Sequence, residues 1–309
     1  MKPAYKLDPA QHAEALRFDA PALMPILQAE ELALKAQLFG VADADAVASR
    51  WRFRICAWVA NFGVAAATFL GAAALAVQNG DWAWAAPALG LLGGAAGFAA
   101  TVALNYLGSG ALMKSWLTAR AKAESRRLEF FRKLVELARD KDTNTQVKCL
   151  DYMKEYYLND WIDYYHDRSD KHGKSGRRWL LIGSIAAALG TAGVMTGGLV
   201  APVWVLAGVL GTTVASFVTT QETLGQNLRN ADRYRQTWEN LIDMRGRLVQ
   251  VGGKVQAGDT TALETWVEEL CEHLIQEHRE WLTQGESAQS TLTQLQEKLR
   301  APTPPAAQG

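Results

Sequence analysis

Three long stretches without a charged residue constrain this 309-residue chain more than any other feature. They cover residues 55–80, 82–113 and 179–221, and are 26, 32 and 43 residues long. A helix needs about 20 apolar residues to cross a bilayer, so each stretch has room for at least one membrane span. The mean hydropathy of −0.08 hides this pattern, because the rest of the chain is rich in charge. The sequence therefore predicts an integral membrane protein.

The stretches divide into four expected spans. The first two lie near residues 55–77 and 83–107, with a turn at 78–81. The third stretch fits two short spans, 179–197 and 203–220, joined at Gly197, Gly198 and Pro202. A single long span there would bury a polar tip. We expect an all-α fold with four transmembrane helices in two hairpins and helical cytoplasmic bundles.

Basic residues predict the orientation of these hairpins. They flank every span on the side away from the two hairpin turns, and the turns themselves carry no Lys or Arg. By the positive-inside rule, both termini and all parts outside the spans are predicted to be cytoplasmic. No apolar segment resembling a signal peptide precedes residue 55, so we expect the first span to direct insertion.

The remaining sequence is predicted to form amphipathic helices. The expected segments are N-terminal helices at 1–54, a hairpin at 55–113, cytoplasmic helices at 114–178, a hairpin at 179–221, cytoplasmic helices at 222–285 and a tail at 286–309, disordered from about 301. We expect helix breaks near Gly40 and near Gly252 and Gly253. Two capping boxes are predicted, Thr143 with Gln146 and Thr261 with Glu264.

One cytoplasmic helix carries an aromatic stripe. Its members follow one another at spacings of three and four residues: Leu150, Met153, Tyr157, Trp161 and Tyr164. Such a face is expected to pack against a partner helix.

Sites for chemistry are sparse. The 32 basic residues balance 32 acidic ones, which argues against a nucleic-acid binder held by bulk charge. Gly173-Lys174-Ser175 lacks the preceding glycine of a phosphate-binding loop. Cys271, His273 and His278 do not converge on one helix face, and no nucleophile motif accompanies the histidines. We expect no catalytic residue, metal or cofactor, and hence no enzyme.

The spans themselves carry a polar pattern. Gly208, Thr212, Ser216 and Thr220 recur every fourth residue, Gly90, Gly93, Gly94 and Gly97 form two overlapping small-residue pairs, and Asn61 and Asn105 add amides at depth. Tight helix packing is the favoured interpretation. The alternative is a weakly polar pore lining formed when several chains associate. No Asp, Glu, Lys or Arg lies inside a span, which argues against a proton-coupled pump.

The two halves of the chain look alike over a short segment, residues 122–127 against 230–235, and similar helix composition would also explain this likeness. Each half resembles the SLATT family of two-transmembrane effectors. The resemblance is carried by Trp116-x3-Arg120-x3-Glu124-x2-Arg127-x2-Phe130, by Asp160-Trp161-Ile162-Asp163-Tyr164-Tyr165 before Arg177-Arg178-Trp179, and by Glu277-Arg279-Glu280-Trp281. It covers roughly residues 20–285. Many members have one hairpin per chain, whereas two are expected here.

The resemblance implies an effector of bacterial conflict systems in the inner membrane, which oligomerises and permeabilises the membrane when a nucleotide second messenger or a nucleotide-sensing partner protein acts. Membrane lipids and further copies of the chain are the other expected partners. For coupling the signal to the spans we single out Arg120, Lys122, Arg177 and Arg178. The alternative is a non-conducting scaffold or receptor whose aromatic stripe recruits a cytoplasmic protein.

Overall fold

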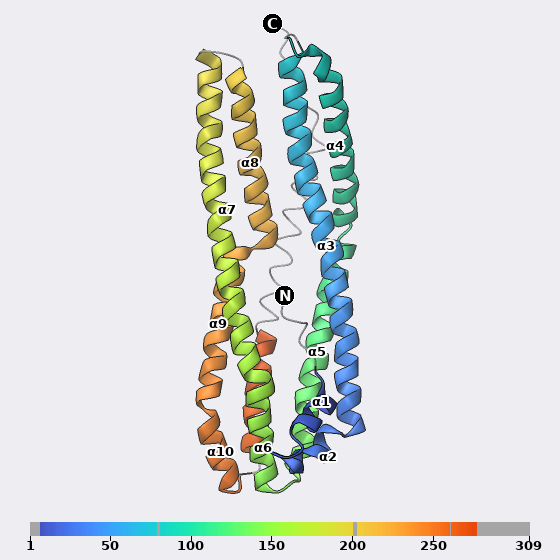
Figure 1. Ribbon diagram of the computed structural model, residues 1–309, viewed down its shortest axis with the longest axis vertical. Coiled ribbons are helices and arrows are strands. Elements are labelled where there is room, and N and C mark those ends of the chain that lie inside the picture. Colours follow the sequence, from blue (N-terminus) through green and yellow to red (C-terminus); the bar gives the residue numbers. More distant parts are fainter. Residues whose placement is uncertain (1–6, 79–80, 200–202, 260, 277–309) are drawn as a thin grey trace. The chain divides into compact units, whose positions relative to one another are not determined.

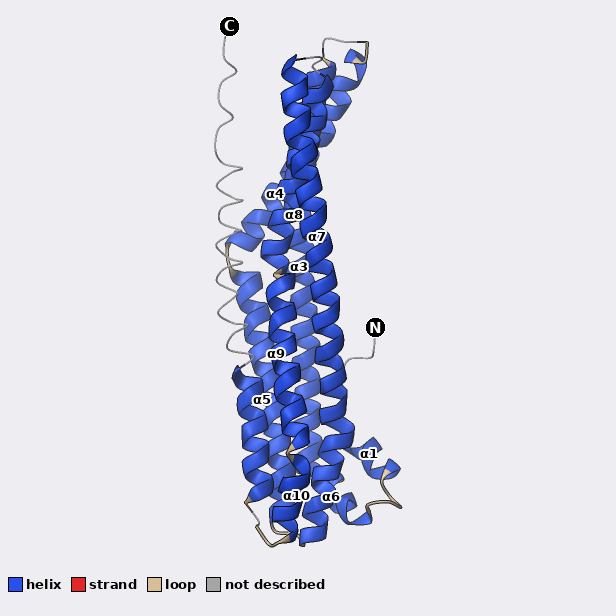
Figure 2. Ribbon diagram, turned by 90° about the vertical axis from the view of Figure 1, so that its left-hand side faces the viewer, coloured by secondary structure: helices blue, strands red, loops and turns tan. Residues whose placement is uncertain are grey.

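The computed structural model describes residues 7–78, 81–199, 203–259 and 261–276, and in this part of the chain every regular element is a helix (Figures 1 and 2). The elements are α1 (Pro9–Ala15), η1 (Pro21–Leu23), α2 (Met24–Leu27), α3 (Glu30–Val77), η2 (Ala83–Ala85), α4 (Ala86–Gly108), α5 (Ala111–Arg139), α6 (Thr143–Met153), the π-helical turn η3 (Lys154–Leu158), α7 (Asn159–Leu199), α8 (Val203–Gly225), α9 (Asn227–Gly246), α10 (Leu248–Gln256) and a further helix over 262–276. The all-α prediction is confirmed for these residues.

Four helical stretches are long and apolar enough to cross a membrane. They are Glu30–Val77, Ala83–Gly108, Thr143–Thr196 and Trp204–Gln256. They cover the four predicted spans, apart from residue 197 of the third and residue 203 of the fourth. The predicted connection at Gly197, Gly198 and Pro202 falls on residues whose structure or side chains lie outside the described part, as do the tail at 286–309 and His278.

The chain divides into two compact units. In the described part of the chain, the bundle unit comprises 7–49, 115–171, 230–259 and 261–276, and the apolar unit comprises 50–78, 81–114, 172–199 and 203–229. The helices α3, α5, α7 and α9 each contribute residues to both units.

The bundle unit has a conventional aromatic core. Phe131 on α5 packs edge-to-face on Tyr157 and on Trp161, with ring centroids 5.2 Å apart in both pairs. Such pairs contribute about 0.5–1.5 kcal/mol each beyond the burial of their area. From the 262–276 helix, the buried Trp266 donates its Nε1 hydrogen to the Met244 carbonyl at 3.2 Å. The core therefore joins α5, the π-helical turn, α7, α9 and the last described helix.

The aromatic stripe faces this core, except for its last predicted residue. Leu150, Met153, Tyr157 and Trp161 are buried as predicted for a packing face, but Tyr164 is 42% exposed and Tyr165, at 3%, takes its place. Both tyrosines lie at helical spacing from Trp161, three and four residues further on, so spacing alone does not choose between them. Tyr165 is the one that packs against Tyr234 of α9, with ring centroids 5.8 Å apart.

Two predicted helix breaks are wrong. Gly40 lies inside α3, and Gly252 and Gly253 lie inside α10. A glycine within a helix costs only about 1 kcal/mol, which neighbouring packing offsets. The helix α10 ends instead at Gln256, and Gly258 closes it with a φ of +94°, a conformation that glycine adopts without strain. There the Gly258 amide donates to the Val255 carbonyl and the Asp259 amide to the Lys254 carbonyl, the Schellman pattern.

The two predicted capping boxes are also corrected. At the start of α6 the cap is Asp142, which accepts from the Thr145 amide at 3.0 Å, while the Gln146 amide group donates to the Arg139 carbonyl. The Thr145 hydroxyl also donates to Asp142, and its hydrogen bond together with that of the Thr145 amide lowers the pKa of Asp142. At the second site Thr261 directly precedes the last described helix, as predicted, but its hydroxyl and its amide both donate to Asp259 Oδ1, at 2.8 and 3.0 Å. At both sites an aspartate just upstream accepts these hydrogen bonds, because a carboxylate is a stronger acceptor than a hydroxyl.

Small residues join the helices of the apolar unit. On α3 and α4, a Cβ at Gly63 would lie 2.8 Å from the Ala96 carbonyl oxygen, and one at Gly93 would lie 3.3 Å from Leu70. Nothing lies within 4 Å of a Cβ at Gly90 or Gly94. Of the two overlapping glycine pairs predicted on this helix, only Gly93 and Gly97 therefore face α3.

The helices α7 and α8 approach more closely still. A Cβ at Gly211 would lie 2.5 Å from the backbone of Gly190, and one at Gly193 would lie 2.6 Å from the amide nitrogen of Gly208. Contacts of this kind require the absence of side chains on both helices. Gly208 of the predicted small face is thus a packing residue.

Large apolar side chains of this unit point away from its interior. Leu91 is 76% exposed, Phe98 73% and Leu189 64%, whereas the buried positions of α4 include Gly93, Ala100 and Ala103. A protein surrounded by water places these two classes the other way round. The surface of the apolar unit is suited to a hydrocarbon environment.

Candidate functional site

A groove between α3 and α8 collects most of the polar side chains predicted within the spans. It has a volume of about 190 Å³, and its lining includes Asn61, Thr68, Thr212, Ser216 and Thr220. The structure therefore brings Asn61 together with three members of the predicted stripe. Asn105 is exposed on α4 and is not part of this lining.

Asn61 holds the two walls of the groove together. Its side chain is buried, with 3% exposed, and its amide nitrogen donates to the Phe217 carbonyl at 3.1 Å and to Gln221 Oε1 at 3.0 Å. Hydrogen bonds of this kind between membrane helices contribute about 0.6 kcal/mol on average and at most about 1.7 kcal/mol. Gln221 was not singled out from the sequence, because nothing local indicates that its helix meets α3.

The hydroxyl groups of the groove differ in their partners. Thr212 donates to the Gly208 carbonyl at 3.1 Å and Thr68 to the Val64 carbonyl at 2.9 Å, so both hydroxyls are satisfied within their own helices. Within the described chain Ser216 makes no such bond, and it is exposed in the groove. The stripe thus serves helix packing at Gly208 and forms a polar wall from Thr212 to Thr220.

A joint at the end of α8 is a second feature that the sequence did not reveal. The helix ends at Gly225, Gln226 adopts a φ of +47°, and α9 begins at Asn227. Glu222 closes the break, because its carboxylate accepts from the Leu228 amide at 3.0 Å and from the Asn227 side chain at 2.9 Å. The Glu222 side chain therefore caps the start of α9.

The joint is also fastened to α7. His172 Nδ1 lies 2.9 Å from Asn227 Oδ1, and a Cβ at Gly176 would lie 2.7 Å from Leu228. The first residues of α9 therefore lie against α7.

The four predicted coupling residues divide between the two units. In the bundle unit Arg120 forms ion pairs with Glu124 and Asp43, and Lys122 is exposed. In the apolar unit Arg177 and Arg178 are exposed, and Arg177 Nε donates to the Gly173 carbonyl at 3.3 Å. Each pair belongs to a different unit.

The bundle unit holds buried charge that sequence reasoning did not identify. Glu124 pairs with both Arg120 and Arg127, and the Arg127 guanidinium lies 5.0 Å from the centre of the Trp161 ring. Arg233 is 4% exposed, and its three guanidinium nitrogens have no hydrogen-bond acceptor among the described residues. Buried ions without a partner cost several kcal/mol. In the likeness of 122–127 to 230–235, Ala123 and Ala231 are both buried, whereas Glu124 is buried and its counterpart is exposed.

Groups suited to catalysis or metal binding are not brought together in the described residues. No cluster of three His, Cys, Asp or Glu side chains lies within reach of one metal ion there. Gly173, Lys174 and Ser175 lie inside α7. Burial raises the pKa of the Cys149 thiol to about 12 and that of Cys271 to about 11, which keeps both thiols protonated.

Comparisons with protein-family models, with curated proteins and with solved structures found no match to this chain.

Proposed function

We propose that this chain is a bacterial inner-membrane effector that oligomerises and lets ions cross the membrane when a nucleotide signal or a partner protein acts on its cytoplasmic helices. The proposal places α3, α4, α7 and α8 across the bilayer as two hairpins, with the bundle unit in the cytoplasm. The sequence resemblance to SLATT effectors supplies the biological setting. The structure supplies three supporting observations.

The first support is the surface of the apolar unit. Its large exposed side chains are hydrocarbon, and the stacked indoles of Trp82 and Trp84, with ring centroids 5.9 Å apart, lie at the start of the second span. Amphipathic indole rings favour the headgroup region of a bilayer.

The observation that carries the proposal is the groove between α3 and α8. Its Asn61 amide and its Thr212, Ser216 and Thr220 hydroxyls form a polar, uncharged wall among predicted spans that are mostly apolar. Such a wall suits partly hydrated ions with weak selectivity. A groove of about 190 Å³ is one wall of a path, so several copies are needed to close a pore.

A third support is the joint of Glu222, Asn227 and His172, which links α9 to α7 and α8. A ligand shifts a conformational equilibrium only if it binds one state more tightly than the other. A signal that binds the bundle unit and moves α9 would shift the spans through this joint.

The alternative scaffold function is less favoured. It depends on the aromatic stripe as a recruiting surface, and Leu150, Met153, Tyr157 and Trp161 are buried in the chain's own core. Only Tyr164 of the stripe is exposed. Recruitment through this face would require the bundle unit to open.

Membrane potential in bacteria tests the proposal. A voltage-sensitive dye would compare the wild-type chain, Ser216→Leu and the matched control Thr191→Leu, which changes an exposed hydroxyl of α7 outside the groove. Cells would carry the chain alone or with its neighbouring genes, at equal membrane levels. We expect depolarisation by wild type and by Thr191→Leu, and its loss in Ser216→Leu.

Two results would contradict the proposal. Depolarisation by all three chains would agree with a pore but would show that the groove between α3 and α8 does not line it. An unchanged potential with wild type in both genetic settings would refute the pore itself and leave the scaffold function.

A further inference from the structure

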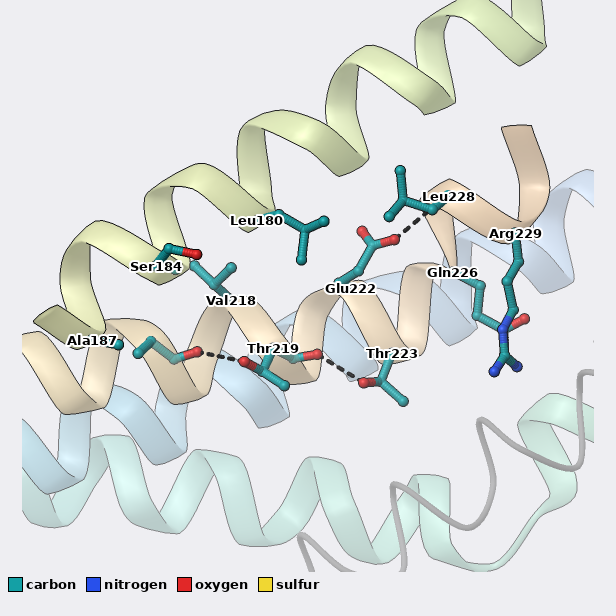
Figure 3. A pocket seen from close by; sticks show the side chains of 12 residues that line it. Leu180, Ser184, Ala187, Val218, Thr219, Glu222, Thr223, Gln226, Leu228 and Arg229 are labelled. Carbon is teal, nitrogen blue, oxygen red and sulfur yellow. Dashed lines mark hydrogen bonds between the residues drawn. The ribbon is translucent and has the colours of Figure 1, made fainter. Parts of the chain in front are cut away.

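A second groove lies on the other side of α8, where this helix faces α7 (Figure 3). Its volume is about 580 Å³, within the usual range of pockets that hold small molecules. Toward Ala187 the lining is mostly apolar, with the hydroxyls of Ser184 and Thr219 among it, and toward Arg229 it is mostly polar, with Glu222, Thr223 and Gln226 beside Leu228 (Figure 3). The groove is therefore more polar at the Arg229 end than at the Ala187 end.

Most polar groups at the polar end are already engaged. The Thr223 hydroxyl donates to the Thr219 carbonyl at 2.8 Å, and the Thr219 hydroxyl donates to the Ala215 carbonyl at 2.9 Å. Glu222 uses one carboxylate oxygen for the Leu228 amide and the other for Asn227 (Figure 3 shows the first of these bonds). These side chains build the groove and leave little capacity for a ligand.

Two arginines supply positive charge for recognition. Arg229 lines the groove, is exposed and forms no ion pair within the described part of the chain. Arg177 lies outside the lining and donates its Nε hydrogen to the Gly173 carbonyl, but it is exposed and lies three residues before Leu180 and seven before Ser184, so it shares their face of α7. The Glu222 carboxylate is the one negative side chain in the lining, and both of its oxygens already accept amide hydrogens.

We propose that this groove binds an anionic glycerophospholipid of the surrounding membrane, with an acyl chain along Leu180, Ala187 and Val218 and the phosphate headgroup at Arg229 and Arg177. Two features favour this occupant. The positive charge of the two arginines complements an anionic headgroup, and the change from an apolar to a polar lining matches the change from acyl chain to headgroup. The inference rests on the membrane placement in the proposed function and is independent of conduction. The lipid contacts α7, α8 and the start of α9, so it bridges the helices that meet at the joint.

Alkaline carbonate extraction of membranes is the first step of the test. Release of the full-length chain would refute the membrane placement, and with it both the proposed function and this site. Retention establishes the placement and lets the lipid measurement test the groove alone.

Native mass spectrometry of the detergent-purified chain would then count retained phosphatidylglycerol against phosphatidylcholine. We expect wild type to retain the anionic lipid preferentially and Arg229→Gln to lower that retention about fivefold, the equivalent of about 1 kcal/mol for one basic group. Arg178→Gln is the matched control, because it removes the same charge from a neighbouring position on another face of α7. It should leave retention unchanged.

Filling the groove gives an independent arm. Ser184→Leu places a larger side chain in the lining and should lower retention of both lipids, while Arg229→Lys should keep the anionic preference. Circular dichroism would verify the fold of each variant. Equal retention of the two lipids by wild type, or equal losses in Arg229→Gln and Arg178→Gln, would overturn the site.

Discussion

Alanine at Gly211 tests the closest contact in the apolar unit. The added Cβ would lie 2.5 Å from the Gly190 backbone, whereas ordinary contacts lie at 3.4–4 Å, so α7 and α8 must separate by roughly 1 Å. Overpacking of this kind costs about 1–3 kcal/mol. Alanine also removes the helix penalty of glycine, which returns about 1 kcal/mol.

Gly90→Ala is the matched control, because its Cβ meets nothing within 4 Å on α4. The propensity gain occurs in both variants and cancels between them. The difference between their free energies of unfolding is therefore the overpacking cost alone, about 1–3 kcal/mol.

The assay is equilibrium unfolding of the purified chain in detergent micelles titrated with dodecyl sulfate, followed by circular dichroism. We expect Gly211→Ala to unfold at lower dodecyl sulfate than wild type and Gly90→Ala at equal or higher. Equal shifts in the two variants would show that α7 and α8 do not meet at Gly211, and would refute the packing described for this unit.

Three further predictions follow from single contacts. A double-mutant cycle of Asn61→Ala and Gln221→Ala, measured in the same assay, should give a coupling energy of about 0.6–1.7 kcal/mol, and additive effects would exclude the hydrogen bond. The thiols of Cys149 and Cys271, buried and with raised pKa values of about 12 and 11, should react with a maleimide only at the rate at which the bundle unit unfolds; fast labelling of the native chain would contradict their burial. Burial lowers the pKa of His12 below 6.5 despite the carboxylates of Asp8 and Asp160, so protonation favours the unfolded state and the contribution of His12 to stability is lost as pH falls through 6.5. Thermal unfolding of His12→Gln should therefore depend less on pH between 7 and 5 than that of wild type, and equal pH profiles would contradict this.

The helical architecture could be predicted because its signals are local. Runs without charge must be long to cross a membrane, and amphipathic spacing locates the faces of the other helices. The stripe from Leu150 to Trp161 was identified in this way. Its end was wrong because Tyr164 and Tyr165 both lie at helical spacing from Trp161, and the contact of Tyr165 with Tyr234 on another helix decides between them.

The site could be predicted only in part for the same reason. Three residues of the predicted stripe line the groove, since a helix that repeats hydroxyls every fourth residue must present them on one face. The partner of Asn61 depends on a contact between α3 and α8, in which Asn61 and Gln221 are 160 residues apart in sequence. The joint at Glu222 depends on the positive φ of Gln226, which could not be predicted because residues other than glycine rarely adopt it.

The membrane placement of the four helices is the central claim, and cysteine labelling in spheroplasts measures it most directly. In a chain with Cys56, Cys149 and Cys271 replaced by alanine, single cysteines at Asp81 and at Lys122 would be exposed to a membrane-impermeant maleimide. We predict that Asp81→Cys is labelled on intact spheroplasts and that Lys122→Cys is labelled only after the membrane is permeabilised. Labelling of both positions, or of Lys122→Cys alone, on intact spheroplasts would contradict the placement.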